Sequence, residues 1–147
     1  MKTIVITSGY FNPIHPGHLE CLELCKALGD ELWVIVNNDQ QVRLKTGKEE
    51  VFQDEEFRLR VVSALKVVDQ VFLAVDQDGS VCESIRGLVK EIKKLNSGDV
   101  RLIFGKGGDR FSGNIPEVQV CEELGVEIRD GLGVKTHNSS EYRGKVE

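Results

Sequence analysis

The sequence has no long hydrophobic run, no excess of basic residues and no internal repeat, and each absence excludes a class of protein. No apolar stretch approaches the ~20 residues that a membrane-spanning helix needs. The net charge is −5, whereas general nucleic-acid binding requires a basic surface. Because no low-complexity segment or linker interrupts the chain, we expect its 147 residues to form a single domain, residues 1–147.

Cysteine is scarce, and the four that occur form no standard metal-binding motif. Cys21 and Cys25 are four residues apart on an expected helix and share a face, so they could be half of a metal site. No Cys-x-x-Cys pair and no matching Cys/His pair accompanies them, which favours free thiols in the core of a cytoplasmic protein. The N-terminus lacks a full signal-peptide pattern, and its apolar run is better interpreted as a strand.

Strand and helix patterns alternate along the chain. Short apolar runs, typical of parallel strands covered on both faces, occupy residues 3–7, 31–36, 70–75, 100–104 and 126–129. Helices are expected at residues 19–28, at 54–67, from a capping box at 80–83 to about 95, and from 116 to about 125, with a short one near 139. Residues 40–53 are expected to form a mobile loop. The order predicts an α/β fold, a Rossmann-like, doubly wound, five-stranded parallel sheet with helices on both faces.

The segment between the first strand and the first helix, residues 8–18, reads S-G-Y-F-N-P-I-H-P-G-H. Gly9 has no Cβ, so backbone amides beside it can approach a bound group. His15 and His18 lie at the entry to a helix, where free N–H groups and the helix dipole favour an anion. Two imidazoles at this position suit a phosphate that gains charge in a transition state.

This segment resembles the H-x-G-H signature of the cytidylyltransferase-like nucleotidyltransferases, with G-Y-F-N in the place of their G-x-F-D lead-in. In that family the two histidines contact the triphosphate and stabilise the transition state at the α-phosphorus. The resemblance implies nucleotide-binding roles for Gly9, Tyr10, Phe11, Asn12, His15 and His18. Asn12 stands where the family usually has Asp.

Two further segments resemble the phosphate-binding parts of the family. The run V-N-N-D-Q-Q-V-R-L-K-T-G-K is similar to a loop whose lysine reaches phosphate, and Lys45 is its closest match. Lys48 could substitute for Lys45 in acceptor binding. Arg58, in D-E-E-F-R-L-R, resembles an arginine of the phosphate region, although it could equally be a surface partner of the acidic residues before it.

The nucleotide site of the family continues in two later segments. F-G-K-G-G-D-R resembles the stretch that follows strand four in heptose 1-phosphate adenylyltransferases, which implies nucleotide contacts for Gly105, Lys106, Gly108 and Asp109. H-N-S-S-E-Y-R resembles the last family signature, I-S-S-T-x-x-R, on the spacing of Ser139, Ser140 and Arg143. His137 and Asn138 depart from that signature. The resemblance implies a catalytic set of His15, His18, Lys45 and Arg143.

The resemblance implies an enzyme that transfers AMP or CMP from an NTP, ATP or CTP, to a phosphorylated small molecule and releases pyrophosphate. Mg²⁺ would accompany the triphosphate, without a dedicated protein site. A sugar 1-phosphate is the favoured acceptor; glycerol 3-phosphate with CTP and FMN with ATP are the alternatives. A nucleotide-binding module without turnover is the non-enzyme alternative. No nucleic-acid or membrane partner is expected, and a homodimer would fit the family.

Overall fold

The computed structural model describes residues 1–107 and 115–133. It contains five strands in this part of the chain, β1 (Lys2–Gly9), β2 (Glu31–Val36), β3 (Gln70–Leu73), β4 (Val100–Gly105) and β5 (Glu127–Arg129). Its helices are α1 (Pro16–Lys26), α2 (Asp39–Thr46), α3 (Glu55–Ser63), α4 (Cys82–Leu95) and α5 (Glu117–Leu124). No helix in these residues is long and apolar enough to cross a membrane.

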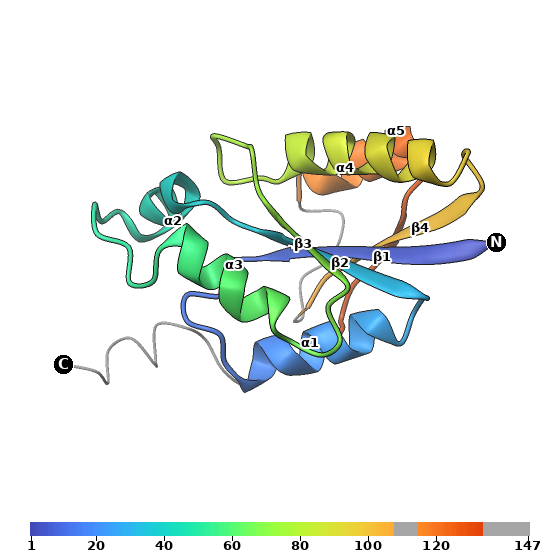
Figure 1. The fold of residues 1–147 in the computed structure, drawn as a ribbon. Helices are drawn as coiled ribbons and strands as arrows, with labels where there is room; N and C mark the ends of the chain where they lie inside the picture. The colour runs from blue at the N-terminus through green and yellow to red at the C-terminus, as the bar shows by residue number, and fades with distance from the viewer. Residues whose placement is uncertain (108–114, 134–147) are drawn as a thin grey trace.

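The strands form one sheet in the order β3-β2-β1-β4-β5, and every neighbouring pair is parallel. Figure 1 shows α4 and α5 on one face of this sheet and α1 and α3 on the other. The predicted α/β fold with a doubly wound five-stranded parallel sheet is therefore confirmed.

Both faces of the central strands are buried, which explains why they appear in the sequence as continuous apolar runs. Ile4 and Ile6 of β1 pack toward α4 and α5, whereas Val5 between them packs toward α1 and α3. On α1, Leu22 and Cys25 are buried, but Leu19 and Leu24 are each 40% exposed. All four cysteines are free thiols.

The prediction of a mobile loop at residues 40–53 is wrong for its first half, which belongs to helix α2. The signals for this helix are local. Asn38 caps it by accepting from the Gln41 amide at 2.9 Å, and the Gln41 side chain accepts from the Asn38 amide in return. Gly47 ends the helix in the left-handed conformation, with φ of 71°. A polar helix of eight residues has little apolar periodicity, so its caps are the better evidence.

One helix end and one helix cap also differ from prediction. Helix α3 ends at Ser63 rather than at residue 67. Helix α4 begins as expected, but Ser80 does not form the predicted capping box. Asp76 caps this helix instead, because its carboxylate accepts from the backbone amides of Glu83 at 2.7 Å and Ser84 at 3.1 Å.

Candidate active site

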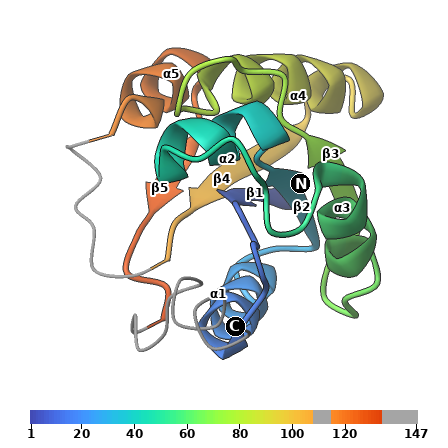
Figure 2. The same ribbon diagram turned by 90° about the vertical axis from the view of Figure 1, so that its left-hand side faces the viewer.

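Three of the residues predicted to act on phosphate, His15, His18 and Lys45, follow the carboxyl ends of β1 and β2. Strands β1 and β4 are neighbours in the sheet, and the chain leaves them toward opposite faces, which makes this the point where ligands bind in such folds. Figure 2 looks onto this edge, with α1 below it and α2 above. A side-chain hydrogen bond links β1 and β4 at this edge, since the Thr7 hydroxyl donates to the Gly105 carbonyl at 2.7 Å.

His15 and His18 cap helix α1 through each other. The His15 ring accepts a hydrogen bond at Nδ1 from the Gly17 amide, and His18 Nδ1 accepts from the His15 amide, both at 3.1 Å. The two rings are stacked, with centroids 3.8 Å apart. Since both Nδ1 atoms accept, the hydrogen of each neutral imidazole lies on Nε2. The helix cap thereby fixes two N–H donors side by side at the positive end of α1.

The environment keeps His18 neutral. Burial, the neighbouring His15 and the positive charge of Lys45 together lower the pKa of His18 from 6.5 to about 3. His18 therefore acts near neutral pH as a hydrogen-bond donor and not as a cation. Its ring also contacts Phe11, with centroids 4.9 Å apart.

The G-Y-F-N segment is shaped by its own side chains. Phe11 is buried with φ of 50°, and a Cβ on Gly9 would lie 2.7 Å from the Phe11 ring. Gly9 is thus required at least for packing, a reason that the sequence did not reveal. Asn12 is also buried, and its Oδ1 accepts from the Gln53 amide at 2.9 Å. An aspartate oxygen could accept the same bond, so the departure at Asn12 preserves this link.

Arg58 is a structural clamp, and the prediction that it binds the acceptor is not supported. Its side chain is fully buried. The guanidinium donates to the carbonyls of Gln53, Tyr10 and Asn37 at 2.7, 2.9 and 2.6 Å, and to the Asp39 carboxylate at 2.8 Å. Four protein oxygens thus engage a group that has five donors. The alternative, a surface partner of nearby acids, is wrong because Arg58 is buried.

Lys45 lies on α2 and faces the histidines. Its ammonium stands over the Tyr10 ring, 4.1 Å from the ring centroid, and its charge acts on His18. Lys48 lies beyond the end of α2 and is exposed. The fold therefore brings His15, His18 and Lys45 to one place, which we call the histidine site together with Tyr10 and Phe11.

The loop after β4 lies against helix α1. A Cβ on Gly105 would be 2.7 Å from Cys25 Sγ, and one on Gly107 would be 2.9 Å from Cys21 Sγ. These glycines are therefore required for close packing of strand on helix. The backbone amide of Lys106 donates a hydrogen bond to the Arg129 carbonyl, with a nitrogen–oxygen distance of 2.8 Å. The remaining predicted site residues, namely Gly108, Asp109, Ser139, Ser140 and Arg143, lie outside the described part of the chain.

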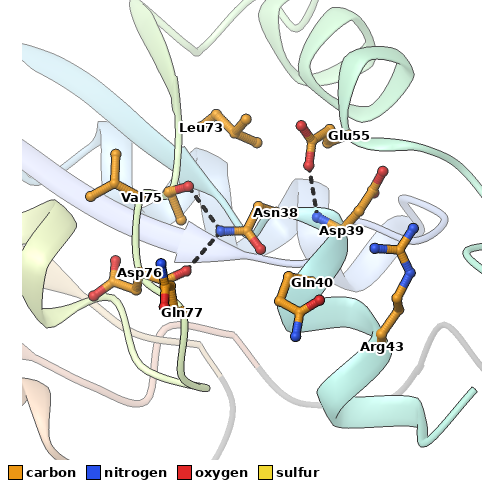
Figure 3. A pocket seen from close by; sticks show the side chains of 10 residues that line it. Asn38, Asp39, Gln40, Arg43, Glu55, Leu73, Val75, Asp76 and Gln77 are labelled. Atoms are coloured by element: carbon orange, nitrogen blue, oxygen red, sulfur yellow. Dashed lines mark hydrogen bonds between the residues drawn. The ribbon is translucent and has the colours of Figure 1, made fainter. Parts of the chain in front are cut away.

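A pocket of about 720 Å³ opens at the same edge of the sheet, beside α2 and the end of β3 (Figure 3). We call it the β3 pocket; its lining includes Asp39, Arg43, Glu55, Asp76 and Gln77. Glu55 accepts from the Asp39 amide at 2.9 Å. The sequence had not indicated this pocket, because its residues come from three separate segments.

The comparisons with known proteins agree with this geometry. The sequence model of the family described as "Cytidylyltransferase-like" matches residues 6–141. An FAD synthase from Methanocorpusculum labreanum is 30% identical over 142 residues, which cover 95% of this chain and 91% of that enzyme. The bifunctional protein HldE of Desulfatibacillum aliphaticivorans is 32% identical over 127 residues, 86% of this chain and 23% of the relative.

A solved structure is also similar. The lipopolysaccharide core biosynthesis protein from Thermoplasma volcanium GSS1 has 28% sequence identity and a TM-score of 0.62, and the match covers 90% of this chain and 98% of that one. The chain spans only part of several curated relatives, 18% of an HldE protein from Azorhizobium caulinodans and 46% of an FAD synthase from Archaeoglobus profundus.

Proposed function

The chain belongs to the cytidylyltransferase-like family, and from this premise we propose that it is a nucleotidyltransferase. It transfers AMP or CMP from an NTP to a phosphorylated small molecule. The observation that carries the proposal is the stacked pair His15 and His18 at the N-terminus of α1, with Lys45 near enough to lower the pKa of His18. Two N–H donors and one cation in this arrangement suit phosphate oxygens that gain charge during transfer.

The reaction requires no covalent intermediate on the protein. An oxygen of the acceptor phosphate attacks the α-phosphorus in line, a new P–O bond forms, and the bond to the β-phosphate breaks to release pyrophosphate. His15 and His18 donate from Nε2 to the phosphate oxygens, and Lys45 neutralises their charge. Arg143, Ser139 and Ser140 remain proposed contacts on the evidence of their spacing alone.

Mg²⁺ is expected to enter with the triphosphate, as it does for most NTP substrates. Among the described residues no group of three or more His, Cys, Asp or Glu side chains is placed to hold a metal ion. We therefore assign the ion to the phosphates and water and route no step through this chain's carboxylates.

A sugar 1-phosphate, with ATP, remains the first candidate acceptor. It is supported by the K-G-G-D and L-K-T-G-K segments and by the likeness to HldE proteins. FMN, with ATP, is the second candidate, because the similarity to an FAD synthase extends over 95% of this chain. The CTP-dependent reaction on glycerol 3-phosphate is the third, and rests on the sequence resemblance.

The test is pyrophosphate release with ATP and with CTP against sugar 1-phosphates, glycerol 3-phosphate, phosphoethanolamine and FMN. We expect release with ATP and one phosphorylated acceptor, and release slower by ~10²-fold or more from a His18→Ala variant assayed in parallel. Silence with every pair, in protein that binds ATP by calorimetry, would contradict turnover and support the nucleotide-binding module.

A further inference from the structure

Tyr10 differs from its neighbours in the G-Y-F-N segment because its ring contacts helix α2. Phe11 and Asn12 are buried below the segment, with 4% and 3% of their surfaces exposed. Tyr10 is only half-buried, and one face of its ring lies under the Lys45 ammonium at 4.1 Å. This distance is typical of a cation–π contact.

Both partners of this contact are fixed by the same buried group. The Arg58 guanidinium donates to the Tyr10 carbonyl at 2.9 Å and to the carboxylate of Asp39, the first residue of α2, at 2.8 Å. Lys45 lies in the last turn of that helix. The backbone of Tyr10 and the helix that carries Lys45 are therefore held to one anchor, which sets the position of the ammonium relative to the ring.

The contact places the charge where the chemistry needs it. Lys45 acts electrostatically on His18, the second histidine of the stacked pair. Lysine has a long, flexible side chain, and each Lys45 rotamer that turned away from His18 would lose this electrostatic effect. A cation–π contact at a partly exposed site is weak enough to be exchanged for the full charge of a phosphate.

We propose that Tyr10 is a positioning residue that holds the Lys45 ammonium beside the histidine pair and releases it to incoming phosphate. This inference rests on the proposed nucleotidyl transfer and adds a residue through which Lys45 acts. It assigns the effect to the face of the aromatic ring, so the Tyr10 hydroxyl is not required.

The test is a double-mutant cycle of Tyr10→Leu and Lys45→Ala, measured as kcat/KM for the NTP and as the Kd of ATP by calorimetry. We expect Tyr10→Leu to weaken both by about three- to fivefold, in line with an exposed cation–π contact. In the Lys45→Ala background, the same change should have less than a twofold effect. Tyr10→Phe, which retains the aromatic ring, should keep both kcat/KM and the Kd of ATP close to the wild-type values. Phe57→Leu, which removes another ring that is 48% exposed, is the matched control.

A readout without turnover separates this inference from the proposed function. The side-chain methylene protons of Lys45 should show an upfield NMR shift from the Tyr10 ring in the wild type and in Tyr10→Phe, and should lose it in Tyr10→Leu. Absence of transfer with every acceptor would overturn the proposed function, while the shift and the ATP cycle would still test the contact. Additive effects of the two substitutions on both kcat/KM and Kd would overturn the positioning role.

Discussion

The histidine site and the β3 pocket lie at the same edge of one parallel sheet, but their polar groups are used differently. In the histidine site, the bonds that cap α1 occupy Nδ1 of His15 and His18 and turn both Nε2–H groups into donors. In the β3 pocket, the carboxylates of Glu55 and Asp76 accept from backbone amides of neighbouring elements. Position at the carboxyl edge of the sheet is therefore not sufficient for binding phosphate. The side chains there must also have hydrogen-bond donors that the protein's own structure does not use.

The β3 pocket and the histidine site also differ in the sign of their charge. The β3 pocket presents Asp39, Glu55 and Asp76 against a single cation, Arg43. The histidine site combines two Nε2–H donors with the ammonium of Lys45. A phosphate would meet repulsion in the pocket and attraction at the histidine site, so we expect the two regions to respond very differently to substitution.

The largest effect is expected at Arg58, which joins the two regions. Arg58→Met leaves the carbonyls of Tyr10, Asn37 and Gln53 without their donor and Asp39 without its cation. We expect it to lower the free energy of unfolding by about 3–5 kcal/mol, as loss of one partner of a buried ion pair does. Urea denaturation measures this.

Arg60→Met is the matched control for that experiment, because Arg60 is exposed on the same helix. It should change the free energy of unfolding by no more than about 0.5 kcal/mol. Equal losses in the two variants would show that Arg58 is not the clamp between the regions.

His18→Ala should give the next largest effect, a fall in kcat of ~10²-fold or more with the fold retained, because a preorganised contact to the transition state is lost. Two variants separate the cap from the donor. Asparagine can imitate Nδ1 and keep the bond from the His15 amide, whereas glutamine can place an N–H near Nε2. We expect His18→Asn to resemble alanine and His18→Gln to recover part of the activity.

Circular dichroism and thermal unfolding check that these variants are folded. Turnover within a few-fold of the wild type in His18→Ala would remove the phosphate contact from the mechanism.

The lowered pKa of His18 should also appear in stability against pH. The unfolded chain binds a proton at His18 as the pH falls through 6.5, whereas the folded protein does not until about pH 3. The contribution of His18 to stability is therefore complete above pH 6.5 and is lost as the pH falls toward 3. Between these values His18→Asn should lose stability with falling pH less steeply than the wild type. Identical slopes in urea denaturation would contradict the lowered pKa of His18.

The smallest effect is expected in the β3 pocket. Glu55→Gln keeps an oxygen that can accept from the Asp39 amide, and it removes one negative charge from the lining. We expect kcat/KM to stay within about twofold of the wild type, as for most surface substitutions. A fall in the kcat/KM of Glu55→Gln as large as that of His18→Ala would show that the pocket takes part in the reaction. It would contradict the distinction between the two regions.

The sequence was informative wherever the signal was local. The order of strands and helices, and the position of His15 and His18 at a helix entry, follow from short apolar runs and one motif, and the structure confirms both. Helix α2 could also have been predicted from Asn38, Gln41 and Gly47, but its polar sequence resembles a loop when apolar periodicity is the criterion.

Arg58 shows what could not be predicted. In the sequence it follows three acidic residues and resembles a solvated or phosphate-binding arginine. Its acceptors come from the loop after β1, the loop after β2, the first residue of α2 and the segment just before α3, and only the parallel arrangement of the strands brings these segments together.

The sequence by itself determined the alternation of strands and helices and the chemical types available for phosphate, since these depend on neighbours along the chain. The tertiary structure decided which groups remain to act. It buried Arg58 as a clamp and set Lys45 over Tyr10. The physical reason is that a polar group must satisfy its hydrogen bonds on burial, and its partners are distant in sequence and close only in the fold.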